Sequence, residues 1–325
     1  MTDLPATDPP ATDPQATVAK ATAHASPGRL STLHRRILDW YALEARDLPW
    51  RDPGTSPWGV LVSEVMLQQT PVRRVEPVWR QWMSRWPTPA ALASSASGDA
   101  VQAWGRLGYP RRALRLHAAA TAMVERHNGD VPGTLPELLA LPGVGAYTAA
   151  AVSAFAFGQR TAVVDTNVRR VFARAVGGSG QAAPSLTRDE TNLAVALLPE
   201  DHVEARTWGV AVMELGALVC LARSPRCPDC PVRDLCAWQL AGRPAYEGPV
   251  RRAQSWHGTD RQCRGVILAA LRATTEPVAQ CDVDALWPAD DPQRDRCLDS
   301  LVADGLVEPL PGGRLRLPGR QDLTN

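Results

Sequence analysis

The sequence predicts a mainly α-helical protein with a small α+β module at its C-terminal end. Between residues 33 and 240, only the segment 161–164 has the composition of an extended run. Elsewhere in that region apolar residues recur at helical spacing, and turns containing glycine or proline separate the patterns. Residues 260–325 instead combine helical patterns with a hairpin pattern. At 325 residues the chain is long enough for two domains.

Composition excludes several classes of protein. A net charge of +1 predicts no general attraction to polyanions, so any nucleic-acid contact must come from local patches. The chain has no run of about 18 apolar residues and no basic-then-apolar secretory signal at its start. Seven cysteines, four of them clustered, favour a reduced compartment with a metal site over a disulfide framework. We therefore expect a cytoplasmic protein that has no membrane span.

The N-terminal part begins with near-repeats of Ala, Thr, Asp and Pro. Residues 1–28 contain too little apolar surface to fold, and we expect a disordered tail there. The first helix is predicted over 31–45, and Pro49 ends it. The break leaves Trp50 between Arg46 and Asp47 on one side and Arg51 on the other.

A second helix, predicted over 58–70, is apolar on nearly all sides and therefore buried. Glu64 lies inside it, flanked by Leu61, Val65 and Leu67. One interpretation places Glu64 on a narrow solvent-facing stripe. The other buries the carboxylate, and an apolar environment disfavours its charged form, as a proton donor at neutral pH requires.

Further helices are predicted over 75–86, 100–105, 112–126, 146–157, 191–198 and 204–219. Two turns between helices contain glycine. In the first, Tyr109 follows Leu107 and Gly108, and it is either a core residue or a wedge that stacks on a base. The second is Leu141-Pro142-Gly143-Val144-Gly145, where the glycines permit positive φ values. Helix, glycine hairpin, helix is either an ordinary turn or a DNA-backbone clamp whose free N–H groups face a phosphate.

Asp165 precedes a helix predicted to begin near Thr166, where aspartate is a common N-cap. Further along, Cys220, Cys227, Cys230 and Cys236 have the spacing C-x6-C-x2-C-x5-C. Thiolates this close together can all bind one soft metal centre. Structural zinc usually has two C-x2-C pairs and only one is present, so we predict a [4Fe-4S] cluster over zinc. Cys263, Cys281 and Cys297 are expected to be small buried residues.

The C-terminal module follows a linker rich in Pro, Gly and Arg at 241–259. Its predicted helices span 260–273, 283–287 and 291–304, and a Gly-Gly turn joins two strands at 306–310 and 314–317. Three helices and a hairpin suggest a winged-helix-like module over 260–325. The cluster loop 220–236 then belongs to a core domain over 29–240.

The hairpin LPGVGAYTA, the segment VVDTNVRRV, the helix SEVMLQQT and the cysteine loop together resemble the helix-hairpin-helix DNA glycosylase superfamily. Within it they resemble the adenine DNA glycosylases (the MutY type), which remove adenine mispaired with 8-oxoguanine. The resemblance covers about residues 33–238 and implies a six-helix barrel domain beside a helical domain that carries the cluster. It implies a monofunctional enzyme of base excision repair that works as a monomer. The implied substrate is double-stranded DNA with A:8-oxoguanine or A:G mispairs, and the implied location is the nucleoid.

The resemblance also implies residue roles. Glu64 is the general acid that protonates adenine N7, and Asp165 stabilises the oxocarbenium that develops at C1′. Tyr147 and Asn167 lie near the reacting sugar. Arg46, Trp50 and Arg51 form the wall of the adenine pocket. Contacts around the opposing base come from Gln69, Thr70, Leu107 and Tyr109. The DNA backbone is contacted by Gly143, Val144 and Gly145.

Two alternatives remain. An endonuclease III-type glycosylase/lyase needs a lysine nucleophile, and that family has it where this sequence has Tyr147. The only lysine here is Lys20, in the predicted tail. A non-catalytic iron–sulfur DNA-binding protein would not need both Glu64 and Asp165. The sequence departs from the resembled family at Pro110, where a second tyrosine is usual, and in its C-terminal module, which is too short for the family's usual β-rich domain.

Overall fold

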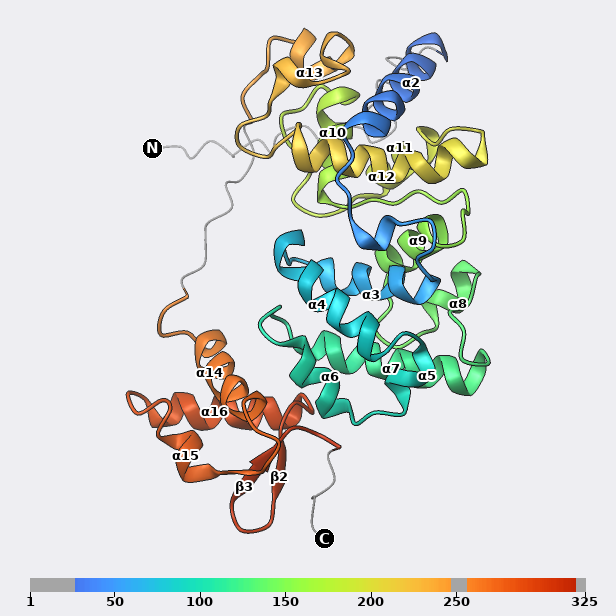
Figure 1. The fold of residues 1–325 in the computed structure, drawn as a ribbon. Coiled ribbons are helices and arrows are strands. Elements are labelled where there is room, and N and C mark those ends of the chain that lie inside the picture. Colours follow the sequence, from blue (N-terminus) through green and yellow to red (C-terminus); the bar gives the residue numbers. More distant parts are fainter. Residues whose placement is uncertain (1–26, 247–255, 320–325) are drawn as a thin grey trace, which may run out of the picture. The chain divides into compact units, whose positions relative to one another are not determined.

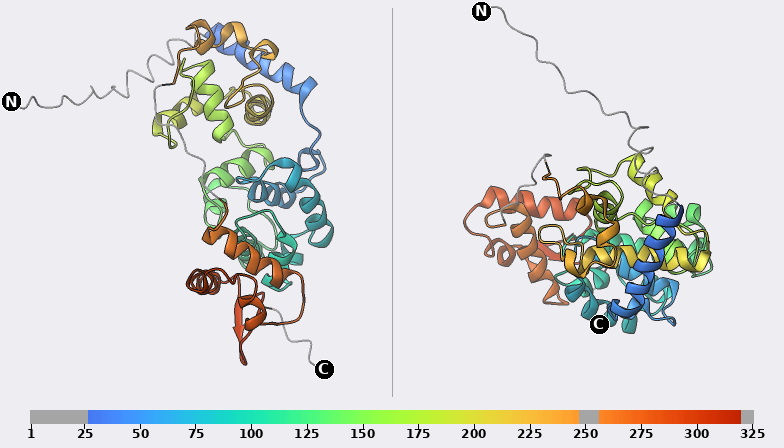
Figure 2. Two further views of the ribbon diagram at one scale, coloured as in Figure 1. Left: turned by 90° about the vertical axis from the view of Figure 1, so that its left-hand side faces the viewer. Right: turned by 90° about the horizontal axis from the view of Figure 1, so that it is seen from above.

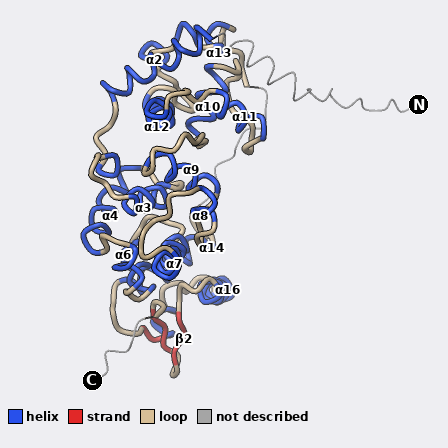
Figure 3. Tube along the Cα trace, turned by 90° about the vertical axis from the view of Figure 1, so that its right-hand side faces the viewer, coloured by secondary structure: helices blue, strands red, loops and turns tan. Residues whose placement is uncertain are grey.

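The computed structural model describes residues 27–246 and 256–319, and these are mainly helical with connecting loops, with strands only near the C-terminus (Figure 3). The predicted tail, apart from its last two residues, and residues 247–255 of the predicted linker lie outside the described residues. The chain divides into two compact units, Met1–Arg46 with Gly158–Val250 and Asp47–Phe157 with Arg251–Asn325. In the part of the chain that the structure describes, no helix is long and apolar enough to cross a membrane.

The first unit consists of helices packed around one apolar core. Its elements are α2 (Pro27–Glu44), α10 (Thr166–Ala175), α11 (Arg188–Ala196), α12 (His202–Leu218), η2 (Cys227–Asp229), η3 (Arg233–Leu235) and α13 (Ala237–Leu240). Trp208 of α12 lies in the centre, stacked on Phe172 with ring centroids 6.3 Å apart. Thr187 and Glu190 form a capping box that starts α11, and Asp201 caps α12.

The second unit begins with helices from the middle of the chain (Figure 1). They are η1 (Pro49–Arg51), α3 (Pro57–Leu67), α4 (Val72–Arg85), α5 (Pro89–Ala93), α6 (Ser97–Trp104), α7 (Arg111–Arg126), α8 (Leu135–Leu139) and α9 (Ala146–Phe155). Trp82 and Trp104 are completely enclosed, with ring centroids 5.5 Å apart in an edge-to-face arrangement. Helix α3 is buried along nearly its whole length, as its apolar sequence predicts.

The C-terminal module contains α14 (Asp260–Arg272), β1 (Val278–Ala279), α15 (Gln280–Asp284), α16 (Asp291–Ala303), β2 (Glu308–Leu310) and β3 (Arg314–Arg316). The strands form an antiparallel sheet in the order β1-β3-β2, with Pro309 opposite Leu315. Three helices and a hairpin agree with the winged-helix-like expectation. Strand β1 was not predicted, because two residues carry no recognisable alternation.

The module packs against α6 and α7 and shares their apolar core, so it belongs to the second unit (Figure 2). The Gly98 N–H donates to Pro318 O at 2.7 Å. A Cβ on Gly98 would lie 2.5 Å from that same oxygen, so only glycine allows this approach. Arg272 donates to Val101 O at 2.9 Å, and Arg111 forms an ion pair with Asp304 at 3.2 Å.

Several sequence expectations differ from the structure. The short helices α5 and α8 were missed, because five residues show too little periodicity. Residues 161–164, expected to be extended, belong to no strand. Cys263 and Cys297 are buried as predicted, but Cys281 is exposed, since the first turn of α15 faces solvent.

Candidate active site and metal centre

Glu64 is buried in α3, with only 6% of its surface exposed. The solvent-facing interpretation is therefore wrong, because the residues on every side of Glu64 in this helix are enclosed as well. The hydroxyl of Tyr147 donates to Glu64 Oε2 at 2.9 Å. Tyr147 lies in the first turn of α9, so the glycine hairpin that starts this helix also places the partner of Glu64.

The glycine hairpin has a positive φ at Gly143, as its sequence allows, whereas Gly145 has an ordinary extended conformation with φ −93°. Gly143 has φ +76°, and a Cβ there would lie 2.5 Å from Cβ of Arg115 on α7. Val144 is buried and anchors the turn, while Gly145 is the N-cap of α9 and provides no capping side chain. The first N–H groups of α9 thus receive no bond from a cap side chain, which suits contact with an anion.

Two neighbouring turns in the second unit are joined through one buried arginine, Arg112 of α7. Its guanidinium donates to five acceptors in the last turn of α3 and in the turns that follow α3 and α6, which are Val65 O, Met66 O, Gln68 O, Thr70 Oγ1 and Gly108 O. Burial lowers the pKa of Arg112 to about 10. The sequence interpretation missed Arg112, because no local pattern distinguishes a buried arginine from a surface one.

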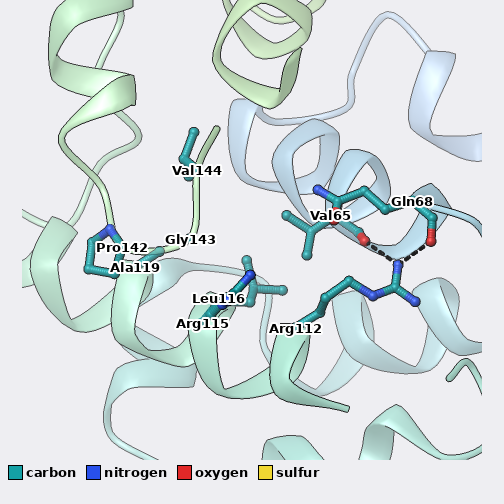
Figure 4. A pocket seen from close by; sticks show the side chains of 9 residues that line it. All are labelled: Val65, Gln68, Arg112, Arg115, Leu116, Ala119, Pro142, Gly143 and Val144. Atoms are coloured by element: carbon teal, nitrogen blue, oxygen red, sulfur yellow. Dashed lines mark hydrogen bonds between the residues drawn. The ribbon is translucent and has the colours of Figure 1, made fainter. Parts of the chain in front are cut away.

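These turns carry the residues expected around an opposing base. Gln69 and Tyr109 are exposed, and both have positive φ values, +56° and +48°. Thr70 and Leu107 are buried, and the Thr70 hydroxyl donates to Leu107 O at 3.0 Å. Tyr109 is therefore not a core residue, while Thr70 and Leu107 hold the turns together. Arg112, Gln68 and Gly143 also line a small pocket between α3, α7 and the hairpin, with a water-accessible volume of about 10 Å³ (Figure 4).

Asp165 is the N-cap of α10 in the first unit, as the sequence predicts. One carboxylate oxygen accepts from the N–H groups of Asn167 and Val168 at 2.8 and 2.7 Å, and the other from Asn167 Nδ2 at 2.7 Å. Burial raises the pKa of the Asp165 carboxyl, and these bonds together with the nearby charge of Arg170 partly offset it. The cap therefore orients the carboxylate, although burial outweighs it in setting the pKa.

Arg170 connects the Asp165 cap to the cysteine loop within the first unit. It donates to Asn167 Oδ1 at 2.8 Å, to Gly216 O at 2.6 Å and to Cys220 O at 2.6 Å. A Cβ on Gly216 would lie 2.6 Å from Cβ of Asn167, so the glycine lets α12 approach α10 closely. Sequence reasoning missed Arg170 and Gly216. The available signal for Arg170 was its place one helical turn after the cap.

The four clustered cysteines are unpaired thiols at the end of the first unit, near η2, η3 and α13. Burial, together with the repulsion of the other three thiolates, raises the pKa of Cys230 to about 12. Four thiolates in such surroundings need a positively charged centre. Within 27–246 and 256–319, no three His, Cys, Asp or Glu side chains converge closely enough for a metal ion. The donor set, four cysteines with only one C-x2-C pair, fits an iron–sulfur cluster better than zinc.

Arg174 supports the same loop from α10. Its buried guanidinium donates to Gly180 O, Leu221 O and Ala222 O and lies 3.4 Å from Cys220 Sγ. It also packs over the ring of Trp238, 4.9 Å from the centroid. The loop carbonyls thus bind a fixed cation on α10, which shapes the loop around its thiols.

The residues expected to line an adenine pocket have well-defined packing roles. Arg46 binds both carboxylate oxygens of buried Glu214 at 2.7 Å, and these bonds raise the pKa of Arg46. Trp50 is buried beside Trp79, and Arg51 is half-buried at the end of η1. Whether they contact a base stays a prediction. Glu64 and Asp165 belong to different units.

Two protein families match this chain, one over the segment with the candidate carboxylates and the other over the cysteine loop. Residues 62–195 match the family of HhH-GPD superfamily base excision DNA repair proteins. Residues 220–236 match the iron–sulfur binding domain of endonuclease III. The first match contains both candidate carboxylates, and the second begins and ends at the outer two cysteines of the loop.

Individual proteins show the same similarity. An adenine DNA glycosylase of Mycobacterium tuberculosis is 55% identical over 284 residues, which are 87% of this chain and 92% of the relative. One from Mycolicibacterium smegmatis is 53% identical over 284 residues, 87% and 95% of the two chains. The structure of a thermostable thymine-DNA glycosylase superimposes with a TM-score of 0.61 at 27% identity, covering 67% of this chain and 99% of that one.

Proposed function

Because this chain belongs to the adenine DNA glycosylases, within the HhH-GPD superfamily of base excision DNA repair proteins, we propose that it excises adenine paired with 8-oxoguanine or guanine. It is an N-glycosyl hydrolase and binds DNA. The observation that carries the proposal is the contrast between its two carboxylates, buried Glu64 bonded to Tyr147 and Asp165 held by three N–H donors. We further propose that it acts as a monomer at the nucleoid.

In this mechanism the target adenine leaves the helical stack, since its glycosidic bond cannot be reached inside the duplex. Glu64 donates its proton to N7 and so makes the base a neutral leaving group. Tyr147 holds the carboxyl group in place through the 2.9 Å bond to Oε2. As the C1′–N9 bond breaks, the Asp165 carboxylate stabilises the positive charge that develops at C1′. Water then adds to C1′.

Asn167 and Arg170 act as positioning residues for Asp165. Asn167 donates to the carboxylate, and Arg170 fixes Asn167 through its amide oxygen. The chain binds a [4Fe-4S] cluster. Cys220, Cys227, Cys230 and Cys236 would hold this cluster, which would anchor the loop rigidly. Arg170 also bonds to Cys220 O, so the order of that loop supports the position of Asn167.

Contacts on the DNA follow the same assignments. Gly143 and Gly145 let the hairpin main chain approach a phosphate, with Val144 as its buried anchor. Exposed Gln69 and Tyr109 contact the opposing base, and buried Thr70 and Leu107 support their turns. Arg46, Trp50 and Arg51 form the wall of the adenine pocket.

A bifunctional glycosylase/lyase, the main alternative, is disfavoured by the same site. Such an enzyme needs an amine nucleophile, and the residue beside Glu64 is Tyr147. The only lysine of the sequence is Lys20, outside the described residues. A non-catalytic DNA-binding protein would have no use for a buried acid bonded to a tyrosine hydroxyl.

The test is single-turnover excision from duplexes that differ only in one base pair. Adenine opposite 8-oxoguanine should be released fastest, adenine opposite guanine more slowly, and adenine opposite cytosine least. Thymine opposite guanine is the control for the activity named in the structural relative. Strand cleavage without alkali would support the lyase alternative, and release of thymine but not adenine would contradict the proposal.

A further inference from the structure

Tyr109 is held in a conformation that costs energy. Its φ of +48° lies in the left-handed region, which a bulky residue enters only when its surroundings force it there. Nevertheless 46% of its surface is exposed. The backbone of this turn is therefore strained, and its aromatic ring is nevertheless exposed to solvent.

Hydrogen bonds explain how the main chain of this turn is fixed. Gly108 O accepts from Trp104 Nε1 at 2.9 Å and from Arg112 at 3.0 Å. Leu107 O accepts from the Thr70 hydroxyl at 3.0 Å. These bonds determine the path of the backbone but leave the orientation of the ring to other contacts.

Two guanidinium groups contact the ring itself. The Cζ of Arg112 lies 5.4 Å from the centroid of Tyr109, and the Cζ of Arg261 lies 5.3 Å from it. Arg112 is buried and bonded to main-chain acceptors, whereas Arg261 comes from α14 of the C-terminal module. Arg261 also lies 5.2 Å from the ring centroid of Trp256, so it joins two exposed aromatic side chains.

The packing of the module determines where Arg261 lies. Gly98 of α6 touches Pro318, and Gln102 donates to Arg272 O at 3.0 Å at the C-terminal end of α14. Arg272 in turn donates to Val101 O. Helix α14 is therefore bound to the helix that leads into the Tyr109 turn, and both partners of the Arg261–Tyr109 contact are fixed within one unit.

We propose that Arg261 is a positioning residue that holds the Tyr109 ring in the orientation that distinguishes 8-oxoguanine from guanine opposite adenine. The C-terminal module thereby contributes to specificity through Tyr109, without its own contact to the lesion. This inference rests on the proposed function, in which Tyr109 lies at the opposing base.

The test compares full-length variants by the ratio of single-turnover rates on A:8-oxoguanine and A:G duplexes. Arg261→Gln removes the cation, and the ratio should fall about two- to fivefold, as expected for one exposed cation–π contact. Arg261→Lys keeps a cation and should restore part of the ratio. Arg314→Gln is the matched control, because it removes the same charge from an exposed position on β3 of the same module, and its ratio should equal that of the wild type.

A second pair of variants moves the module without touching Arg261. Gly98→Ala places a methyl group against Pro318 O and Leu317, so α14 should shift and the ratio should fall. Gly265→Ala is the control, since a Cβ at Gly265 meets nothing within 4 Å. An unchanged ratio in a folded Gly98→Ala protein would contradict the role of docking.

A double-mutant cycle separates an effect through Tyr109 from a general one. In a Tyr109→Leu background, Arg261→Gln should cause no further loss of the ratio. The inference is overturned if Arg261→Gln leaves the ratio unchanged, or if its effect persists without Tyr109. Failure of the proposed function is a different result, namely no adenine release by the wild-type protein from the A:8-oxoguanine duplex.

Discussion

The two candidate carboxylates occupy opposite kinds of environment. Glu64 lies within an apolar helix of the second unit, beside a tyrosine hydroxyl. Asp165 lies at a helix N-terminus of the first unit, where three N–H donors and a nearby arginine face it. An apolar enclosure favours a neutral acid, and hydrogen-bond donors with a nearby positive charge favour an anion, although at Asp165 burial still outweighs them and raises the pKa. The same functional group can therefore serve as proton donor and as charge stabiliser in one reaction.

The largest expected effect comes from removing either carboxylate. Glu64→Gln and Asp165→Asn should each slow adenine release by about 10²- to 10⁴-fold, because proton transfer and charge stabilisation are each lost. Single-turnover excision on an A:8-oxoguanine duplex measures this. Duplex binding by both variants should stay close to that of the wild type. A variant that keeps near-wild-type excision would remove that carboxylate from the mechanism.

The next-largest effect should differ between the two units, because the cysteine loop belongs to the first unit. The purified protein should contain about four iron and four sulfide per chain. Cys227→Ser or Cys230→Ser should lose iron and reduce amide protection in α10, where Arg170 and Arg174 bind the loop, and in α12, which Arg170 contacts through Gly216 O.

Protection in α3 and α9 of the second unit should change little in these variants, as hydrogen exchange would record. Cys281→Ser is the matched control, since Cys281 is exposed and lies outside the cysteine loop. Uniform loss of protection across both units would contradict this division, and so would retention of iron by Cys230→Ser.

A smaller effect concerns the partner of Glu64. Tyr147→Phe removes the hydroxyl that donates to Oε2, and we expect excision to slow by about tenfold or less, the order of one hydrogen bond. The measurement compares the single-turnover rate of this variant with that of Tyr246→Phe, the same change in the other unit. Equal rates for both variants would show that the Tyr147 hydroxyl does not assist Glu64.

The smallest effect is a shift in pH dependence. The charge of Arg170 lowers the pKa of Asp165, so Arg170→Gln should raise that pKa further. Because the proposed mechanism requires Asp165 as an anion, the fall of the excision rate on the acidic side should move to higher pH. Arg170→Lys keeps the charge and should move it less. A shift to lower pH would contradict the contact between Arg170 and the Asp165 cap.

Local patterns predicted much of the fold and of the site. Most of the longer helices follow from apolar periodicity, and the caps and glycine turns follow from residue types with strong local preferences. Asp165 was predicted as an N-cap and the Gly143 turn as a hairpin, and the structure confirms both. The cysteine spacing predicted the cluster that the match to an iron–sulfur binding domain supports.

The features that the sequence did not predict depend on contacts between residues far apart in the chain. Arg112 is bonded to acceptors more than 40 residues away, and no local pattern predicts its burial. Burial of Glu64 was one of two interpretations until the packing around α3 was known. The close approach of Gly98 to Pro318 joins segments of the second unit that are far apart in the sequence, so the position of the C-terminal module had no sequence signal.

The most direct test of the two-carboxylate account is the pH dependence of single-turnover excision on an A:8-oxoguanine duplex at saturating enzyme. The wild-type rate should pass through a maximum, falling on the acidic side as Asp165 gains a proton and on the alkaline side as Glu64 loses one. The residual activity of Glu64→Gln should lack the alkaline fall, and that of Asp165→Asn the acidic one. An alkaline fall that persists in Glu64→Gln would contradict the assignment of Glu64 as the proton donor.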